Sequence, residues 1–216
     1  MDVALFKKLP ILGIIRGIGT KDLEPLLETV EMSGLKTIEI TMNTEGAARL
    51  ISRAVSLSGK RLMIGAGTVL NMSSLKSALD AGASFIVMPV LVKDVMAYCV
   101  KHRIPAFPGA LTPQEIHAAW RAGATMVKVF PSSVWGPKYF SEIKGPFNDV
   151  ELLACGGVTA QNMGTYFSSG ADAVSFGSSV FKKEWLEQGD FRKIGRSIKG
   201  YIHGFKSRNP AFPVSF

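Results

Sequence analysis

Short apolar segments recur along this chain at intervals of roughly 20–25 residues, a spacing that few folds can accommodate. Each is bounded by glycine, proline or polar residues, and the eight segments are 11–18, 37–41, 62–68, 85–90, 104–110, 126–131, 152–158 and 173–179. Runs that are apolar on both faces are typical of strands in a parallel sheet, whose two faces are both covered. We therefore predict eight parallel strands.

Signals for helices lie between these segments. Asp22, Asn71, Thr112 (before Pro113) and Thr159 are expected to begin helices, because their side chains satisfy free amides at a helix start. Four glycines come just before the next apolar run and are expected to end helices: Gly34, Gly82, Gly123 and Gly170. Eight strand–helix repeats in 216 residues predict an α/β fold, a single (β/α)8 TIM barrel over residues 1–216. An open, doubly wound sheet is the alternative.

The composition excludes several other classes of protein. With 47% hydrophobic and 19% charged residues, the chain has enough apolar material for a large core and is not intrinsically disordered. Two cysteines, Cys99 and Cys155, cannot form a disulfide framework, which favours a reducing compartment. No apolar run has the length of a membrane span, and the N-terminal stretch lacks a cleavage site for a signal peptide. We expect a cytoplasmic protein with no membrane partner.

The net charge of +8 favours anionic partners of some kind. Part of the excess lies in the stretch 182–208, which holds eight basic and three acidic residues. These basic residues do not alternate with aromatic ones, and the chain contains no known nucleic-acid-binding motif. An anionic metabolite is therefore expected as the partner, and nucleic acid is not, although a basic face that is only solvated remains an alternative.

Two of the predicted strands carry charged residues where the barrel interior should be. Period-two alternation places Thr37, Glu39 and Thr41 inside the barrel, and in the sixth segment it places Lys128 there. A buried carboxylate and ammonium are costly unless they form an ion pair or take part in chemistry. In one interpretation, Lys128 and Glu39 form a structural ion pair. In the other, Lys128 is a nucleophile, since burial favours the neutral amine, and Glu39 is a proton shuttle.

Small and polar residues stand at the ends of other strands, where a barrel has its active site. Thr68 follows a glycine-rich strand end, and Arg16 ends the first strand, either as an anion ligand or as a rim residue. Two strand ends, Cys155-Gly156-Gly157 and Gly177-Ser178-Ser179, precede expected helix starts and predict a phosphate site made of backbone amides. The three histidines lack metal-ligand spacing, and no dinucleotide-binding fingerprint follows the first strand, so neither metal nor cofactor is expected.

Six motifs together resemble the KDPG/KHG aldolase family. They are IEITMNTEGA (38–47), GAGTVL (65–70), PAFPGALTPQE (105–115), KVFPSSVWGPKY (128–139), CGGVT (155–159) and GSSVF (177–181). The match runs in order over most of the chain, from Ile11 to Ser179, whereas the tail from Tyr201 to Phe216 matches nothing recognised. The members are class I 2-dehydro-3-deoxy-phosphogluconate aldolases and their phosphogalactonate relatives.

The resemblance implies a (β/α)8 barrel, commonly a homotrimer, that needs no metal or organic cofactor. It implies that Lys128 forms a Schiff base with a phosphorylated 2-keto acid and that Glu39 is the general acid/base. The residues expected to bind substrate are Arg16, Asn43, Thr68, Pro89, Phe130, Cys155, Gly156, Gly157, Gly177, Ser178 and Ser179. The products would be pyruvate and glyceraldehyde 3-phosphate, with 4-hydroxy-2-oxoglutarate as a possible second substrate.

Two positions differ from the phosphogluconate type, which has Arg where Asn43 stands and Thr where Cys155 stands. The phosphogalactonate relatives have Asn at the first position and an apolar residue at the second. Arg16 would then bind the substrate carboxylate in place of residue 43. The alternatives to an aldolase are a phosphate-binding barrel isomerase or epimerase, and a non-enzymatic basic barrel that binds nucleic acid or protein.

Overall fold

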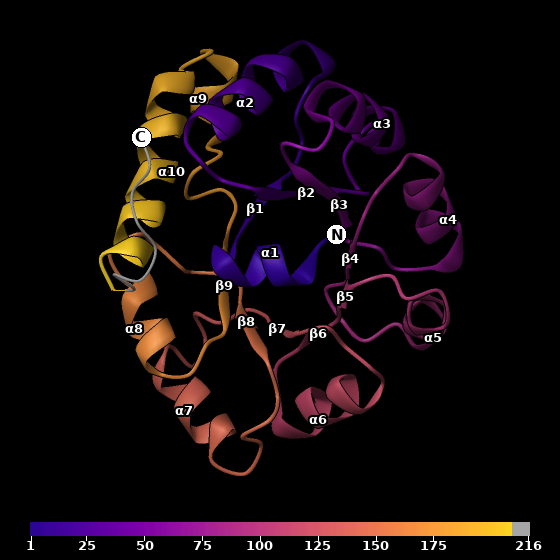
Figure 1. Ribbon diagram of the computed structural model, residues 1–216, viewed down its shortest axis with the longest axis vertical. Helices are drawn as coiled ribbons and strands as arrows, with labels where there is room; N and C mark the ends of the chain where they lie inside the picture. The colour runs from indigo at the N-terminus through magenta and orange to yellow at the C-terminus, as the bar shows by residue number, and fades with distance from the viewer. Residues whose placement is uncertain (209–216) are drawn as a thin grey trace.

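The computed structural model describes residues 1–208, and its elements alternate between strands and helices (Figure 1). The strands are β1 (Ile11–Ile15), β2 (Thr37–Thr41), β3 (Met63–Gly67), β4 (Ile86–Val87), β5 (Ala106–Phe107), β6 (Gly109–Ala110), β7 (Val127–Val129), β8 (Leu152–Ala154) and β9 (Ala173–Phe176). The helices are α1 (Val3–Lys8), α2 (Thr20–Met32), α3 (Ala47–Ser58), α4 (Met72–Asp80), α5 (Lys93–Lys101), α6 (Pro113–Arg121), α7 (Lys138–Lys144), α8 (Met163–Ser168), α9 (Lys183–Glu187) and α10 (Phe191–Lys206).

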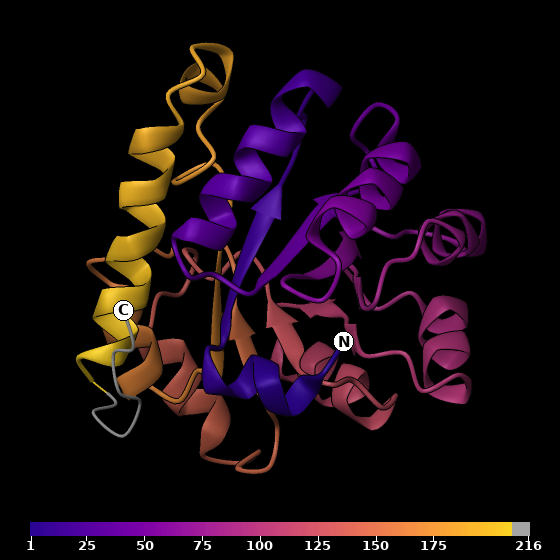
Figure 2. The same cartoon turned by 45° about the horizontal axis from the view of Figure 1, so that its top comes forward.

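The strands form one parallel sheet in the order β5-β4-β3-β2-β1-β9-β8-β7-β6. Its two ends, β5 and β6, are consecutive in the chain, so the sheet curls into a nearly closed barrel surrounded by α2 to α10 (Figure 1). The strand arrows run away from α1, which lies across the amino ends of the strands (Figure 2). The predicted (β/α)8 barrel is confirmed, and the alternative of an open sheet is wrong.

The segment 104–110, which was predicted as one strand, forms two short strands on either side of Pro108. β5 pairs with β4 and β6 pairs with β7, so the interruption falls where the segment changes partners. Proline has no amide hydrogen to donate, but its carbonyl still accepts a hydrogen bond from the Lys128 amide at 2.9 Å. The nine strands therefore occupy the eight positions that the sequence predicts.

Two apolar clusters hold the barrel together. The larger one fills the space between the strands and the surrounding helices. The smaller one fills the barrel interior toward the amino ends of the strands and includes Leu12, Phe85, Phe107 and Leu153. Phe6 of α1 packs edge-on against Phe107, with ring centroids 5.9 Å apart, and closes the amino end of the barrel. The interior is thus apolar at one end, and the charged residues lie toward the other.

Some helix starts were predicted correctly and others were not. Asn71 and Thr112 cap α4 and α6, each with a reciprocal hydrogen bond from the third residue of the helix. The predictions at Asp22 and Thr159 are wrong, because α2 starts at Thr20 after Gly19 and α8 starts at Met163 after Asn162. The glycines at 34, 82, 123 and 170 do adopt the left-handed conformation, with φ between 87° and 102°.

Most of the predicted strands extend too far at their carboxyl ends. β1 stops at Ile15, β8 at Ala154 and β9 at Phe176, several residues before the apolar runs end. Gly17, Gly156 and Gly157 have positive φ and leave the sheet there. The residues beyond each strand form loops at one end of the barrel.

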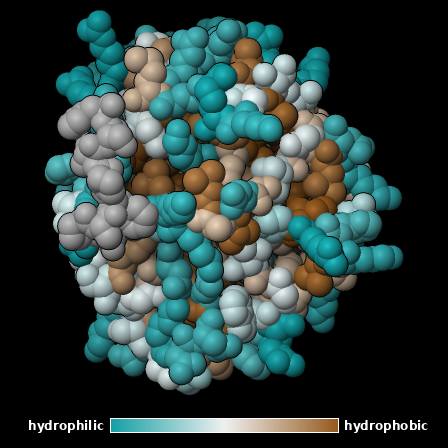
Figure 3. Space-filling model, in the orientation of Figure 1, coloured by the Kyte–Doolittle hydropathy of each residue, from teal (hydrophilic) through white to brown (hydrophobic). Residues whose placement is uncertain are grey.

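The face that carries α1 is mostly polar, with apolar side chains exposed between the charged ones (Figure 3). None of the helices within residues 1–208 is long and apolar enough to cross a membrane. Residues 209–216, half of the tail that matched no known motif, lie outside the described residues.

Candidate active site

Glu39 and Lys128 both lie inside the barrel, as the strand alternation predicts. Only 1% of Glu39 and 7% of Lys128 is exposed. β2 and β7 are four strand positions apart in either direction around the eight-position ring, so the two side chains come from opposite walls. Among the ion pairs of residues 1–208 there is none between Lys128 and Glu39 within 4.0 Å. The closed ion pair of the structural reading is therefore not formed.

The carboxyl group of Glu39 has unusual surroundings. Burial raises its pKa above the ordinary value, and the nearby positive charges of Lys128 and Arg16 reduce that rise without abolishing it. One carboxyl oxygen, Oε2, is buried without a hydrogen-bond partner in the described part of the chain. Gly67 of β3 makes room for this group, because a Cβ at that position would overlap Oε1. A buried carboxyl with a raised pKa and an oxygen without a hydrogen-bond partner suits proton transfer.

The amine of Lys128 is bordered by Phe130 and Cys155. Its Nζ lies 5.2 Å from the centre of the Phe130 ring, and its positive charge acts on the Cys155 thiol. Burial raises the pKa of Cys155, so the thiol stays protonated at neutral pH and is a poor nucleophile. Of these groups, Lys128 is the one suited to attack a carbonyl carbon.

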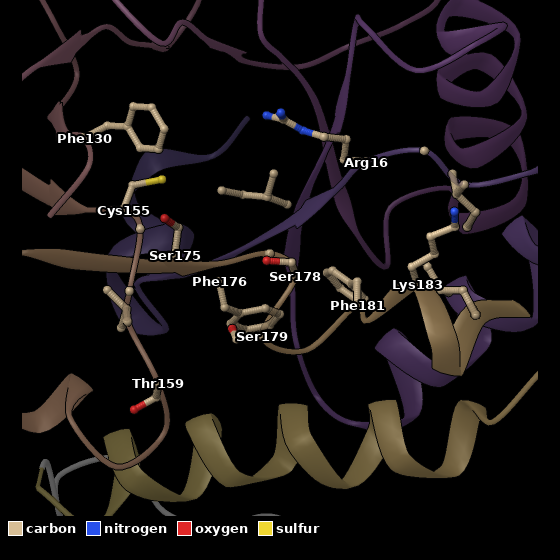
Figure 4. A pocket seen from close by; sticks show the side chains of 18 of the residues that line it. Arg16, Phe130, Cys155, Thr159, Ser175, Phe176, Ser178, Ser179, Phe181 and Lys183 are labelled. Atoms are coloured by element: carbon tan, nitrogen blue, oxygen red, sulfur yellow. The ribbon is translucent and has the colours of Figure 1, made fainter. Parts of the chain in front are cut away.

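A cavity of about 890 Å³ opens beside these residues at the carboxyl ends of β1, β7, β8 and β9. Eight of the eleven residues predicted to bind substrate line it: Arg16, Phe130, Cys155, Gly156, Gly157, Gly177, Ser178 and Ser179. The Arg16 side chain extends across the cavity toward Phe130, and Cys155 and Ser175 point into it side by side (Figure 4). Lys128 itself does not line the cavity, but its Nζ lies next to the ring of Phe130, which does.

Two turns form the part of the cavity that was predicted to bind phosphate. Gly156 and Gly157 have φ of 92° and 77°, and a Cβ on Gly157 would lie 2.6 Å from the Ser133 Cβ, so the turn requires glycine. The prediction that helices start directly after these strand ends is wrong, because α8 and α9 begin later, at Met163 and Lys183. The residues that line this part of the cavity therefore belong to turns and not to helix starts.

Tyr201 of α10 joins these two turns and was not predicted from the sequence. Its hydroxyl donates to the Val158 carbonyl at 2.9 Å and lies 3.3 Å from the Ser179 Oγ. The side chain is 2% exposed, and burial raises the pKa of its hydroxyl. The buried apolar residues of α10, with Ile194, Ile198 and Ile202 among them, define a face on which position 201 falls.

Ser132 and Ser175 are two further buried hydroxyls near Lys128. Ser132 Oγ donates to the Val129 carbonyl at 2.7 Å and accepts from the Cys155 amide at 2.9 Å, which ties the end of β7 to that of β8. Ser175 Oγ donates to the Ala154 carbonyl at 3.1 Å. A serine in the middle of an apolar strand is a signal by which Ser175 could have been found.

Three predicted substrate residues, Asn43, Thr68 and Pro89, do not line the cavity. Asn43 is exposed on the loop after β2, whereas Pro89 and Thr68 are partly buried. Thr68 follows Gly67, beside Glu39, and has φ of 56°, a strained conformation for a β-branched residue. Arg16, which lines the cavity and lies near Glu39, is better placed than Asn43 to bind a carboxylate.

A hydroxyl pair connects the loops that carry Arg16 and Asn43. Thr44 Oγ1 accepts from the Gly17 amide at 3.0 Å and lies 3.0 Å from Thr41 Oγ1. Both threonines are buried. Within residues 1–208 no group of three His, Cys, Asp or Glu side chains is close enough to hold a metal ion.

A parallel barrel with a buried lysine and carboxyl inside, and a glycine- and serine-lined cavity over them, defines an enzyme of the α/β-barrel class. Residues 3–197 match the model of the KDPG and KHG aldolase family. The chain belongs to this family and is an aldolase, a lyase that acts on carbon–carbon bonds.

Two relatives and one solved structure illustrate the similarity. The chain is 32% identical to a probable 2-dehydro-3-deoxy-6-phosphogalactonate aldolase of Rhizobium meliloti, over 85% of this chain and 87% of the relative. It is 31% identical to the 2-dehydro-3-deoxy-phosphogluconate aldolase of Pseudomonas aeruginosa, over 91% and 88%. A solved structure described as native KDPGal superposes with a TM-score of 0.87, at 27% identity, over 93% of this chain and 96% of that one.

Proposed function

We propose that this chain is a class I aldolase that cleaves a 2-keto-3-deoxy-6-phospho sugar acid, of the gluconate or galactonate type, to pyruvate and glyceraldehyde 3-phosphate. The observation that carries the proposal is the buried Lys128, which lies next to Phe130 of the cavity wall and on the barrel wall opposite Glu39 without forming a closed ion pair with it. An unpaired buried amine costs stability, and a fold retains such a group where it has chemistry to perform.

In the proposed reaction the Lys128 amine attacks the C2 carbonyl of the substrate, and loss of water gives an iminium ion. Glu39, directly or through a water molecule, accepts the proton of the C4 hydroxyl. The C3–C4 bond then breaks, its electron pair moves to the iminium, and glyceraldehyde 3-phosphate leaves. The remaining enamine takes a proton at C3, and addition of water releases pyruvate and the free Lys128 amine.

The cavity supports this assignment of substrate. Arg16 lines the cavity and would bind the carboxylate, and the turns at Gly156, Gly157, Ser178 and Ser179 line it as well and would bind the phosphate through their amides. Smaller substrates such as 4-hydroxy-2-oxoglutarate, which would give pyruvate and glyoxylate, would use Lys128 and Arg16 without the turns. We further propose that the protein is one domain, works in the cytoplasm and forms a homotrimer.

The test is reductive trapping. Incubation with pyruvate followed by borohydride should attach the reduced adduct to the peptide that holds Lys128, as detected by peptide mass spectrometry. Lys128→Ala should lose the adduct and at least about 10³-fold of kcat, because the covalent intermediate is then impossible. Lys144→Ala is the control, since this lysine instead pairs with Asp172 at 2.8 Å. An adduct on another lysine, or none at saturating pyruvate, contradicts the proposal.

A further inference from the structure

Two adjacent lysines lie at the start of α9, and they face different surroundings. Lys182 places its Nζ 4.5 Å from the centre of the Trp185 ring and does not line the cavity. Lys183 does line the cavity, together with Leu186 and Glu187 from the same helix. It is also four residues beyond Ser179, which belongs to the turn after β9. The chain thus carries one lysine at the cavity and a matched one away from it.

We propose that Lys183 binds the phosphate end of the substrate and makes the enzyme selective for phosphorylated 2-keto acids; this rests on the proposed function. Figure 4 shows the lining residues in order across the cavity: Phe130 and Cys155 on one side, then Ser175, then Ser178, with Phe181 and Lys183 at the far side. Phe130 marks the Lys128 side, because the Lys128 Nζ lies 5.2 Å from the centre of its ring. A substrate held at C2 by Lys128 would extend its far end along this sequence toward the turn amides and Lys183.

Glu187 is the ion-pair partner of Lys183. Their charged groups are 3.6 Å apart, one helical turn from each other, and both side chains are largely exposed, at 89% and 64%. An exposed pair of this kind is weak, so the lysine can change partner when a dianion arrives. Among residues 1–208, Arg16 is the other cation in the cavity wall, and Asp22 is the second carboxylate there besides Glu187. This described part of the wall therefore holds two cations and two carboxylates, and Lys183 is the cation on the phosphate side.

The proposal makes opposite predictions for the two members of the pair. Lys183→Met keeps an unbranched side chain of nearly the same length but removes its charge, and should raise KM for the phosphorylated substrate about 3- to 10-fold. Glu187→Gln removes a repulsive charge and frees Lys183, and should lower that KM about 2-fold at low salt. KM for 4-hydroxy-2-oxoglutarate, which has no phosphate, should not change in either variant. Lys182→Met is the matched control and should behave as wild type with both substrates.

A second measurement separates this proposal from the proposed function. Calorimetric binding of inorganic phosphate to the wild type should weaken with Lys183→Met and strengthen with Glu187→Gln, whether or not the protein has aldolase activity. Trapping of pyruvate on Lys128 should be the same in all these variants. Loss of trapping in the wild type would overturn the aldolase function alone. Equal phosphate affinity in wild type and Lys183→Met, or a larger effect of Lys182→Met, would overturn the role of Lys183.

Discussion

Individual residues show what strand alternation can and cannot predict. Glu39 and Lys128 were placed inside the barrel because a charged residue in mid-strand has only two possible directions, and both neighbours on its strand are apolar. Asn43 and Pro89 follow strands but do not reach the cavity, because the path of a loop depends on packing that the local sequence does not encode. The positions of Lys183 at the cavity and of Tyr201 behind the turns after β8 and β9 are not predicted for the same reason, since they depend on how α9 and α10 pack against the barrel.

Glu39 should lower the stability of the fold at neutral pH. Because burial raises its pKa, the folded protein binds this proton more tightly than the unfolded chain does. The tighter proton binding of Glu39 stabilises the folded state fully below about pH 4.3, the pKa of this group in the unfolded chain. This contribution to the free energy of unfolding is lost as pH rises through the pKa of Glu39 in the folded protein. Glu39→Gln is neutral at every pH, and should raise Tm at pH 8 by about 2–4 °C, the effect of about 1 kcal/mol in a domain of this size. At pH 4 its Tm should match that of the wild type.

Thermal unfolding followed by circular dichroism measures this difference. Glu45→Gln, which changes an exposed carboxylate in the following loop, is the control and should alter Tm little at either pH. A lower Tm for Glu39→Gln at pH 8 would mean that the carboxylate stabilises the fold by pairing with Lys128, as in the structural reading. The same variant should lose most of its activity if Glu39 transfers the proton.

At the scale of elements, local chemistry predicted the helix ends that depend on local hydrogen bonds. α4 and α6 start where a capping side chain and its third neighbour bond reciprocally. Thr159 and Asn162 make a similar reciprocal pair, with Thr159 N donating to Asn162 Oδ1 at 2.7 Å, yet it closes a turn before α8 begins. The strands were predicted too long because their apolar run continues into loops that glycine bends away from the sheet.

α10 should affect substrate binding although it lies outside the barrel. Tyr201→Phe removes the hydroxyl that joins Val158 to Ser179 and leaves the Val158 carbonyl without that donor. We expect KM for the phosphorylated substrate to rise about 3-fold or more, with the KM for 4-hydroxy-2-oxoglutarate unchanged. The reason is that only the turns after β8 and β9, at Gly156-Gly157 and Ser178-Ser179, lose support; we call them the phosphate turns. Steady-state kinetics with both substrates measure the two values.

The control for this prediction is Tyr139→Phe. The Tyr139 hydroxyl also donates to a backbone carbonyl, that of Leu111 at 2.6 Å, but this bond joins α7 to the loop after β6 and does not involve the turns after β8 and β9. Both variants should lose about 1 kcal/mol of unfolding free energy. An equal rise in KM for both variants, or for both substrates, would show that α10 supports the fold as a whole and not the phosphate turns in particular.

For the whole molecule, the net charge of +8 does not accumulate in the cavity, whose described wall has as many carboxylates as cations. The positive surface can raise the rate at which an anionic substrate arrives, whereas selection depends on a few groups within reach of the bound molecule. The composition alone could therefore predict the sign of the partner's charge. The arrangement of β1, β8, β9 and α9 was needed to locate the cavity where that partner would bind.

The proposed homotrimer requires an apolar surface between copies, and one such surface lies on the loops after β3, β4 and β7. These loops expose Leu70, Val90, Val134 and Trp135, which we call the apolar rim, at between 51% and 61% of their surface. β3 and β4 are adjacent, and only the position of β5 and β6 separates them from β7, so the apolar rim covers one side of the carboxyl end. In a closed trimer each of the three copies would bury its apolar rim against a neighbour.

Trp135→Lys should convert the trimer into monomers, because an unpaired ammonium at the contact costs more than the remaining apolar contacts supply. Sedimentation equilibrium measures the mass directly, and the far-ultraviolet spectrum shows whether the monomer stays folded. Met32→Lys is the matched control: Met32 is 82% exposed at the end of α2, toward the amino ends of the strands, and should leave the trimer intact. A wild type that sediments as a monomer would refute the homotrimer. A Trp135→Lys variant that remains trimeric would move the contact away from the apolar rim.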